Sequence, residues 1–558
     1  MFLILFNWLI IVFICLSIGD LVKQVLKAKS DIRKSDTFLI FLVGFVLVSA
    51  DANILSLCFP IKQWYFIIIF CVALTWVLCN FNRIKESIKQ FTNHYTRSYP
   101  LMIPIWILIS FLAASLSSSQ TLNVDEGGYY LPLVRWIESY PVVAGSGLFN
   151  ARIAQNSIYH MSQAVFGHQT WFNGGMYDLN GLLFVFFNLT AFHSLFRLYE
   201  RKYNSLYKDI LLAAALLFPF SFVIDSMDTD YPSIFISIYF IALTIARYNQ
   251  KRFWQIDFEY YTLWMIGFFL LMTKLFSGAV LIFPLLILCK NTQLKNYGTT
   301  IFTTLLGVFL LAPWIIRNYY LSGYLIYPLH FIDVFEADWK IPLELAKQHY
   351  LVIQDFAKTE IIRSTYFYDG VQDLSISDWI VVWLHRTWDM AIGKALIIFL
   401  PLSLLATVYS IINRQFNLIW VQLYLLIVIL FWFFKFPSIR FCWHFILAFM
   451  VISAVRILKS FEPKLIRMFC IVLGSLCFFS FSRTLVNTVR QVNLEYIFTP
   501  EKTQTLNDFE VFYLDSIPII KSKDEYCNGA KVPCIPYHNN LTIKNKGSDV
   551  KSGFFIEK

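Results

Sequence analysis

The sequence predicts an all-α polytopic membrane protein, and three observations carry this prediction. Of the 558 residues, 58% are hydrophobic and only 15% are charged, whereas an average soluble domain carries about 25% charge. About fourteen apolar stretches approach the ~20 residues that cross a bilayer as a helix. Basic residues gather in alternate loops between these stretches. The composition excludes soluble enzymes and disordered scaffolds, because a water-soluble fold cannot hide so much apolar side chain.

The predicted spans are distributed along most of the chain. The predicted spans are 2–19, 37–58, 64–80, 101–117, 179–196, 209–224, 232–246, 260–273, 276–289, 299–316, 393–412, 417–434, 441–455 and 468–482. The first lacks a basic leading region and a small-residue cleavage site, so we expect a retained helix. The pair 260–273 and 276–289 is short, and the break at Lys274 predicts either a tight turn or a kinked re-entrant element.

The distribution of Lys and Arg predicts the orientation. Loops 20–36 and 81–100, with five later alternate loops, hold half of the 46 basic residues, and such loops face the cytoplasm. The net charge of +10 is therefore a topology signal, and nucleic acid is excluded as a partner. The large loops and the C-terminus are therefore expected outside, on the extracytoplasmic face of an integral membrane protein.

Five parts follow from this layout. Residues 1–100 hold three N-terminal spans, and 101–316 form a core module with a first exterior loop at 118–178. Residues 317–392 form a large exterior loop, 393–482 the C-terminal spans, and 483–558 an extracytoplasmic tail. Sites are often built on such elaborated loops above a rigid scaffold.

The first exterior loop begins with two adjacent carboxylates, Asp125 and Glu126, followed by Gly127 and Gly128. The glycines permit a close backbone approach. An amphipathic helix then offers Leu131, Val134, Trp136 and Ile137 to the lipid surface. This arrangement predicts an acid pair held at the membrane surface, where a lipid-linked substrate presents its headgroup. The alternative is that Asp125 only caps the following helix.

The next exterior loop carries three carboxylates in six residues, Asp225, Asp228 and Asp230. Carboxylates so close repel one another unless a cation shares them. Oxygen-rich clusters suit Mg²⁺, Mn²⁺ or Ca²⁺, so a divalent cation is an optional cofactor here. A solvated loop that avoids positive charge is the alternative.

Cationic side chains lie at exterior helix ends. They are Lys274, Arg317, Arg440 and, beside the last, His444. Ionisable groups near the membrane core suggest a function with a named partner, and phosphate is the natural partner of Arg and Lys together. The alternative is that these side chains extend independently towards the headgroups.

Two cysteines lie in the tail, Cys527 and Cys534. In an oxidising exterior this spacing suggests a short disulfide. A zinc site that adds His538 is the alternative, although a fourth ligand is missing.

Several motifs together resemble the GT-C superfamily of polytopic glycosyltransferases, in its protein mannosyltransferase and aminoarabinose transferase branches. The matching features are Asp125-Glu126, the acidic Asp228 and Asp230, and the basic-aromatic pair Arg440-Phe441. Residues 130–138 with Arg135, then Arg152 and Asn156, and residues 313–318 with Arg317, resemble an uncharacterised bacterial family of such proteins. The resemblance covers roughly residues 100–460.

The resemblance implies a GT-C-like core and transfer of a sugar from a polyprenyl-phosphate donor, with inversion at the anomeric carbon. The acceptor would be a glycan, lipid or protein outside the membrane, as in polysaccharide biosynthesis. The membrane would be the bacterial inner (cytoplasmic) membrane of the cell envelope. Asp125 with Glu126 would be catalytic, and Arg135, Arg152, Lys274, Arg317, Arg440 and His444 would bind substrate or phosphate. Asp225, Asp228 and Asp230 would bind sugar hydroxyls or an optional Mg²⁺ or Mn²⁺.

Two other classes of function stay open at this point. A transporter or flippase for a lipid-linked or small polar substrate would place charges at the membrane midplane, often in repeated halves. A surface-polysaccharide polymerase or ligase would share the lipid-linked substrate and use it differently.

Overall fold

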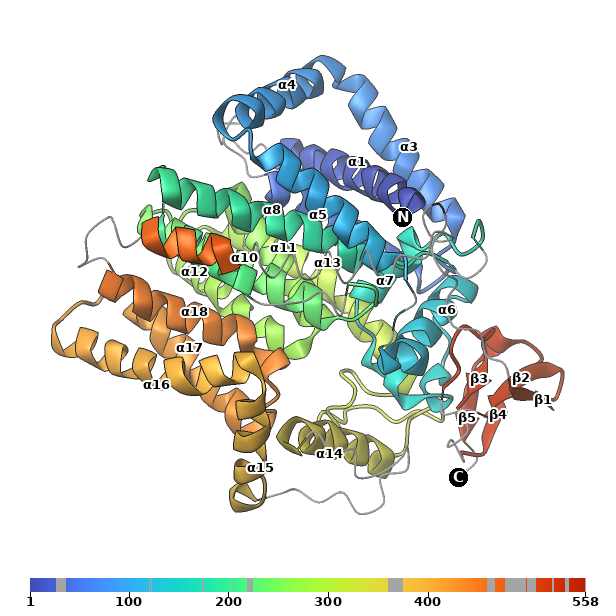
Figure 1. Ribbon diagram of the computed structural model, residues 1–558. Helices are drawn as coiled ribbons and strands as arrows, with labels where there is room; N and C mark the ends of the chain where they lie inside the picture. The colour runs from blue at the N-terminus through green and yellow to red at the C-terminus, as the bar shows by residue number, and fades with distance from the viewer. Residues whose placement is uncertain are drawn as a thin grey trace.

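A bundle of long helices forms most of the structure, and shorter helices, loops and strands cover one end of it (Figure 1). The computed structural model describes residues 1–26, 37–119, 121, 123–172, 175–203, 205–217, 224–359, 375–458, 467–476, 498, 508–523, 526–536 and 541–556. The statements below concern these residues. Part of the predicted span 209–224 and of 468–482 lies outside them, as does His538.

The bundle contains most of the predicted spans as helices. They are α1 (Phe2–Val25), α2 (Thr37–Leu55), α3 (Gln63–Cys79), α5 (Met102–Ser117), α8 (Leu179–Glu200), α9 (Leu206–Ala214), α10 (Asp230–Asn249), α11 (Phe258–Thr273), α12 (Ile282–Gln293), α13 (Tyr297–Ser322), α16 (Ala391–Ile412), α17 (Ile419–Lys435) and α18 (Ile439–Leu458). The 3-10 helices η5 (Ala215–Leu217) and η7 (Leu275–Leu281) continue α9 and precede α12.

Eight of the described helices are long and apolar enough to cross a membrane, or nine if the bent pair α3 and α4 counts as one span. Four further apolar helices are shorter, namely Met102–Ser117, Phe258–Thr273, Ile419–Lys435 and Arg467–Leu476. The long apolar helices fit an integral membrane protein. The predicted number of fourteen spans is not reached by this criterion, and the number and the sidedness of the spans stay predictions.

Helix α10 lies at the centre of the bundle. It packs against α8, α9, α11 and α18, and nearly all of its residues from Asp230 to Arg247 are buried. Its sequence is hydrophobic on every face, which is typical of a helix enclosed by others. Outer helices such as α3, α13 and α16 instead expose Ile, Leu, Val and Phe side chains, as a surface in contact with lipid would.

The N-terminal helices belong to the same core as the rest of the bundle. Helix α2 packs against α7 (Tyr159–Phe166), α11 and α13. The Asn7 side chain on α1 donates to Asp178 over 3.4 Å, and its Oδ1 lies 2.9 Å from His168 Nε2. The residues before and after the predicted boundary near residue 100 therefore share one hydrophobic core.

Two predictions about local structure were wrong. The predicted loop 81–100 is mostly a helix, α4 (Phe81–Ser98), which bends 89° away from α3. The helix predicted for the lipid surface, α6 (Leu131–Ser139), is buried, with Trp136 only 3% exposed. Its apolar face packs against α7 and other parts of the exterior loop, which a hydrophobic stripe alone does not distinguish from lipid contact.

The C-terminal tail departs from the all-α prediction. Strands β1 (Phe509–Leu514) and β2 (Ile517–Ser522) form an antiparallel hairpin, and β3 (Cys534–Ile535) pairs parallel to β2. A second small sheet joins β4 (Ile543–Asn545) to β5 (Phe554–Ile556), with η9 (Val550–Ser552) between them. These strands lie beside α6 at the right of Figure 1.

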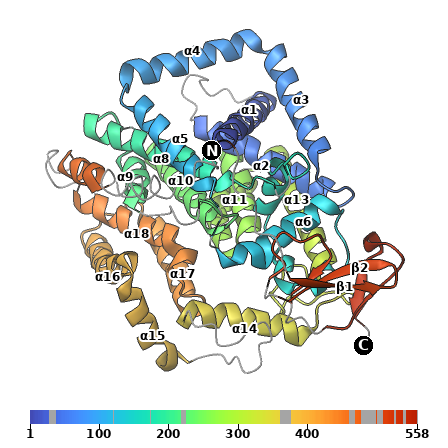
Figure 2. The ribbon, with the colours of Figure 1, turned by 45° about the vertical axis from the view of Figure 1, so that its right-hand side comes forward.

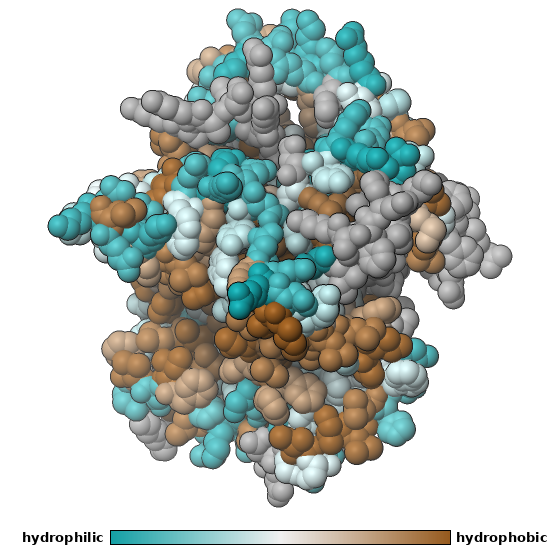
Figure 3. All heavy atoms as spheres, turned by 90° about the vertical axis from the view of Figure 1, so that its left-hand side faces the viewer, coloured by the Kyte–Doolittle hydropathy of each residue, from teal (hydrophilic) through white to brown (hydrophobic). Residues whose placement is uncertain are grey.

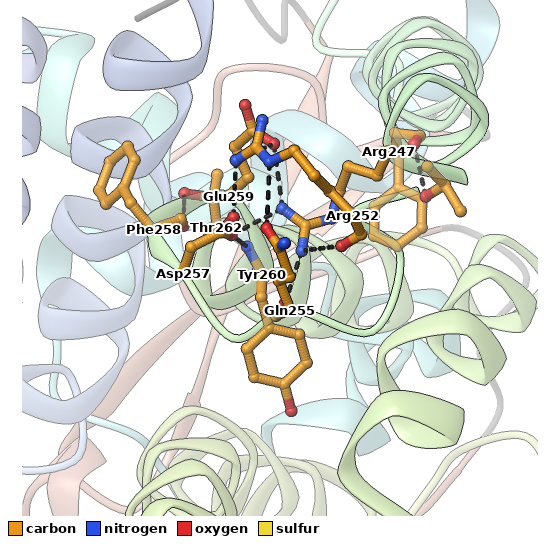
Figure 4. A network of polar contacts seen from close by, with 10 residues as sticks. Arg247, Arg252, Gln255, Asp257, Phe258, Glu259, Tyr260 and Thr262 are labelled. Atoms are coloured by element: carbon orange, nitrogen blue, oxygen red, sulfur yellow. Dashed lines mark hydrogen bonds and ion pairs between the residues drawn. The ribbon is translucent and has the colours of Figure 1, made fainter. Parts of the chain in front are cut away.

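A network of charged side chains fixes the loop between α10 and α11 (Figure 4). The Arg247 guanidinium, only 1% exposed, lies 2.6 Å from Asp257 Oδ1 and 3.0 Å from Glu259 Oε2. It also donates to the backbone carbonyls of Arg252 and Gln255. Arg247, which was counted among the basic residues of the predicted cytoplasmic loops, thus also stabilises the loop between α10 and α11.

Candidate functional site

The candidate site joins four segments that are far apart in the sequence. Asp125 precedes η2 (Glu126–Tyr130), a π-helical turn that contains Gly127 and Gly128, and Arg152 lies on η4 (Ala151–Gln155). Asp230 is the first residue of α10, Lys274 lies between α11 and η7, and Arg440 is in the first turn of α18. The site therefore lies where the ends of three bundle helices meet the loop 118–178, which is predicted to be exterior.

Asp125 is a partly exposed carboxylate beside an arginine. Its Oδ1 lies 3.3 Å from Arg152 Nη1, and the two side chains are 29% and 28% exposed. Its backbone N–H donates to Asn123 Oδ1 over 3.1 Å, which fixes the start of η2. Burial raises the pKa of Asp125 above its ordinary value, while the guanidinium groups of Arg152 and Arg440 oppose that rise. Asp125 is thus a carboxylate of increased basicity that solvent still reaches.

Asp230 holds two cations at the bundle end. Its Oδ1 pairs with Lys274 Nζ, and its Oδ2 lies 3.4 Å from Arg440 Nη1. The Lys274 ammonium also lies 4.2 Å from the ring centroid of Phe441. Arg440 is the most exposed member, since 41% of its side chain is accessible, against 11% for Asp230. The two cations therefore converge on one carboxylate and offer their outer edge to a ligand.

Asn123 connects the Asp125 part of the site to the acidic loop. Its Nδ2 donates to Ser226 Oγ over 3.0 Å and to Asp228 Oδ2 over 3.4 Å. Asp228 Oδ1 in turn accepts the backbone N–H of Asp230 over 2.5 Å. Asp228 is 4% exposed, and burial raises its pKa while Lys274 and Arg440 oppose the rise. A continuous chain of contacts thus runs from Arg152 to Arg440.

Glu126 faces the opposite way from Asp125, into the protein. Its Oε2 accepts hydrogen bonds from Ser226 Oγ and from the backbone N–H of Met227, both over 2.9 Å. Burial raises the pKa of Glu126 to about 8, although these two hydrogen bonds oppose the rise. Asp225 lies near enough to add to it, and burial raises the pKa of Asp225 itself to about 7. Glu126 therefore ties the two loops together and does not face solvent beside Asp125.

The exterior loop that follows α13 reaches the same region. Its helix α14 (Leu343–Thr359) places the Phe356 ring centroid 5.6 Å from the Arg440 guanidinium. His349 of α14 accepts or donates a hydrogen bond with Tyr327 over 2.9 Å, and burial lowers the pKa of this histidine to about 3. Arg152 lies close enough to lower it further. Helix α14 thus contacts Arg440 through Phe356 and lies near Arg152 through His349. Figure 2 shows α14 below the ends of α17 and α18.

Three predicted site residues do not join this cluster. Arg135 is buried and pairs with Glu138, three residues further along α6, over 3.2 Å. Arg317 is 1% exposed and donates to Asn156 Oδ1 over 3.0 Å and to Ser56 Oγ over 3.2 Å. His444 is 1% exposed, one turn beyond Arg440, and is close enough to Lys274 to interact with its charge. None of the three offers an exposed edge to a substrate.

Residues that the sequence reasoning missed complete the cluster. Asn123, Ser226 and Phe356 contact its charged members, as described above. Asn123 stands two residues before Asp125, a spacing typical of an Asx turn, and that spacing was the one available signal. Phe356 has no such signal, because its place depends on how α14 packs.

The tail also contacts the acid-pair segment. Cys527 and Cys534 form a disulfide, and the loop that it closes begins with Asn528. The backbone N–H of Asn528 donates to the carbonyl of Gly127 over 3.1 Å. A Cβ at position 127 would lie 2.0 Å from Asn528 Oδ1, so only glycine fits here without a shift. The tail thus packs on the turn that follows Asp125.

No group of three His, Cys, Asp or Glu side chains that could hold a metal ion occurs in the described part of the chain. In the acidic loop, Asp230 is paired with two cations and Asp228 accepts two hydrogen bonds. These partners do not fit a divalent cation, and no metal is assigned to the site.

Comparison with known proteins gives one match. The model of the family described as Domain of unknown function (DUF8201) matches residues 1–447. No curated protein and no solved structure matches the chain. The match includes every charged residue of the cluster, from Asp125 to Arg440, and ends before the tail.

Proposed function

The chain belongs to this DUF8201 family, and from the geometry of its site we propose that it is a membrane-embedded glycosyltransferase. It transfers a sugar from a polyprenyl-phosphate donor to an acceptor hydroxyl on the extracytoplasmic face. One observation carries the proposal: Asp125, a partly exposed carboxylate, lies in one cluster with the cations Arg152, Lys274 and Arg440.

Asp125 acts as the general base. Its raised pKa brings the carboxylate closer to the pH at which it works, which favours proton transfer in the transition state. The acceptor hydroxyl gives its proton to Asp125 while its oxygen bonds to the anomeric carbon. The bond from that carbon to the phosphate oxygen breaks, and its electron pair leaves with the phosphate.

Lys274 and Arg440 stabilise the departing phosphate. Negative charge grows on the phosphate as the bond breaks, so cations fixed beforehand bind the transition state more tightly than the ground state. Both cations are already held by Asp230 and therefore need little reorganisation. They lie at the ends of apolar helices, so a lipid-linked phosphate reaches them while its polyprenyl chain stays among the lipids.

An activity assay on the full-length protein tests the proposal. The protein is reconstituted into vesicles with a panel of radiolabelled polyprenyl-phosphate sugars and candidate glycan, lipid and protein acceptors. We expect new glycosidic product, and we expect Asp125→Asn to abolish it with unchanged expression and insertion. Asp51→Asn is the matched control, because Asp51 is another exposed aspartate and contacts Tyr65 outside the cluster.

Two outcomes would contradict the proposal. Retained transfer in Asp125→Asn would refute the assignment of the base. Movement of a labelled lipid-linked sugar across the vesicle membrane, without a new glycosidic bond, would favour a flippase or transporter.

A further inference from the structure

Helix α4 has a separate feature that does not depend on the proposed function. Its apolar residues fall three or four positions apart and so form one stripe, composed of Phe81, Ile84, Ile88, Phe91 and Tyr95. Polar and charged residues fill the rest of the helix. None of its described side chains is buried, and Phe81 and Ile88 are 55% and 61% exposed. The end of the stripe packs on the bundle, since the Phe91 ring centroid lies 6.4 Å from that of Trp106 on α5 and the Tyr95 hydroxyl lies 3.3 Å from His193 Nδ1 on α8. The beginning of the stripe, with Phe81 and Ile88, needs another surface to lie on.

The neighbouring helices place α4 across the end of the bundle. Just before α3, the backbone N–H of Ile61 donates to the carbonyl of Ile137 in the first exterior loop, over 2.9 Å. Helix α3 then runs about 25 Å away from that loop, given ~1.5 Å per residue, before the chain turns by 89° into α4. Helix α5 returns to the same loop. Figure 2 shows α4 as a bridge between α3 and α5.

The apolar surface of these neighbours continues onto α4. Helix α3 exposes the apolar side chains Ile67, Ile68, Val72, Leu74 and Leu78. Helix α5 exposes Trp106, Ile107, Leu108 and Phe111. These side chains need acyl chains around them. Because α4 lies at right angles to α3 at its end, the exposed Phe81 and Ile88 reach the boundary between acyl chains and headgroups. An amphipathic helix in this position lies in the plane of the interface.

The charges on α4 indicate the kind of lipid. Arg83 is already engaged, since its Nη1 lies 3.1 Å from Asp20 Oδ1 on α1. Lys85 and Lys89 lie one turn apart along one edge of the stripe, are exposed, and have no acidic partner among the described residues. Hydrophilic side chains gather at the top of Figure 3, at the height of α4 in Figure 1.

We propose that α4 is an in-plane membrane helix whose Lys85 and Lys89 bind the headgroup phosphates of anionic phospholipids. The leaflet is the one opposite the candidate site. The apolar stripe holds the helix at the depth where an ammonium at its edge meets the phosphates. Each lysine near an anionic surface adds to the attraction, so two lysines one turn apart enrich anionic lipid locally.

Photo-crosslinking of the full-length protein tests this proposal. A benzophenone side chain replaces Ile88, and the protein is reconstituted into vesicles of phosphatidylcholine with a minority of phosphatidylglycerol. Mass spectrometry then measures the two kinds of lipid adduct. We expect the ratio of phosphatidylglycerol to phosphatidylcholine adducts to exceed the bulk ratio by up to about 25-fold, since each of the two lysines contributes about fivefold. Lys85→Gln with Lys89→Gln should return the ratio to the bulk value, as should high salt.

A second pair of lysines supplies the control. Lys62 and Lys435 are also exposed, at the ends of α3 and α17 nearest the candidate site. Lys62→Gln with Lys435→Gln removes the same charge and should leave the adduct ratio at position 88 unchanged. Adducts in the bulk ratio in the parent protein would overturn the lipid preference. Protein adducts in place of lipid adducts would show that another polypeptide covers the stripe.

Discussion

Replacing Arg152 by Gln should raise the pKa of Asp125. The guanidinium lies 3.3 Å from the carboxylate and opposes the rise that burial causes. Two unit charges at this distance interact by about 1.3 kcal/mol in water and about 5 kcal/mol at an effective dielectric constant near 20. Both side chains are less than a third exposed, so we expect loss of the guanidinium to favour the protonated form of Asp125 by an energy between these two limits, and its pKa to rise accordingly.

Carbodiimide labelling measures this shift without any substrate. A carbodiimide reacts with the protonated carboxyl, and mass spectrometry of the peptide that contains Asp125 gives the extent of labelling at each pH. Loss of a neighbouring cation favours the protonated form, so labelling in Arg152→Gln should persist to higher pH. The acid limb of the rate profile for glycosyl transfer should move to higher pH by the same amount.

Arg83→Gln is the matched control. Arg83 and Asp20 form a similar pair, 30% and 23% exposed, beside α4. Its loss should leave the labelling of Asp125 unchanged. A midpoint for Asp125 that stays in place, or falls, in Arg152→Gln would refute the claim that Arg152 determines the basicity of this carboxylate.

Three further variants test the structure around the site. Burial raises the pKa of Glu126 to about 8, so its contribution to stability is complete below about pH 4.5 and is lost as the pH rises through about 8. Glu126→Gln should therefore make the melting temperature less dependent on pH over this range. Parallel curves of melting temperature against pH for the parent protein and the variant would contradict this role of Glu126. Gly127→Ala should loosen the tail and increase its amide hydrogen exchange, because the added Cβ would lie 2.0 Å from Asn528 Oδ1. Gly298→Ala is the control, since a Cβ there meets nothing within 4 Å. Equal hydrogen exchange of the tail in the two variants would contradict the tight contact at Gly127. Arg135→Met leaves the buried Glu138 without its cation, although the Tyr177 hydroxyl still donates to it, and should destabilise the protein by about 3 kcal/mol. An unchanged melting temperature would show that this ion pair is dispensable.

The sequence predicted the long apolar helices well and failed where charge and packing compete. The composition and the run lengths locate elements such as α10, whose residues are apolar on every face. In contrast, residues 81–98 were predicted as a loop because they are charged, although their apolar side chains follow a helical period. Helix α6 was predicted at the lipid surface, because a hydrophobic stripe does not say whether lipid or protein covers it.

The same limit applies to the candidate site. Asp125 was proposed from the acid pair in the loop 118–178, and Asp230, Lys274 and Arg440 were proposed from their positions at helix ends. The structure brings these four into one cluster with Arg152. Arg317 has an equivalent position in the sequence, yet it donates to Asn156 and Ser56 inside the protein. The difference lies in long-range contacts that a single sequence does not contain.

The docking of the tail makes the assembly of the protein depend on the order of synthesis. Phe554 in β5 donates its backbone N–H to the carbonyl of Ala144 over 2.9 Å, and its ring packs edge to face against Phe149, while the backbone N–H of Asn528 donates to the carbonyl of Gly127. The ribosome makes the first exterior loop long before it makes these partners. A nascent chain therefore carries Asp125 beside an uncovered turn until the strands of the tail have been made, and a chain that stops before β1 would leave that turn uncovered.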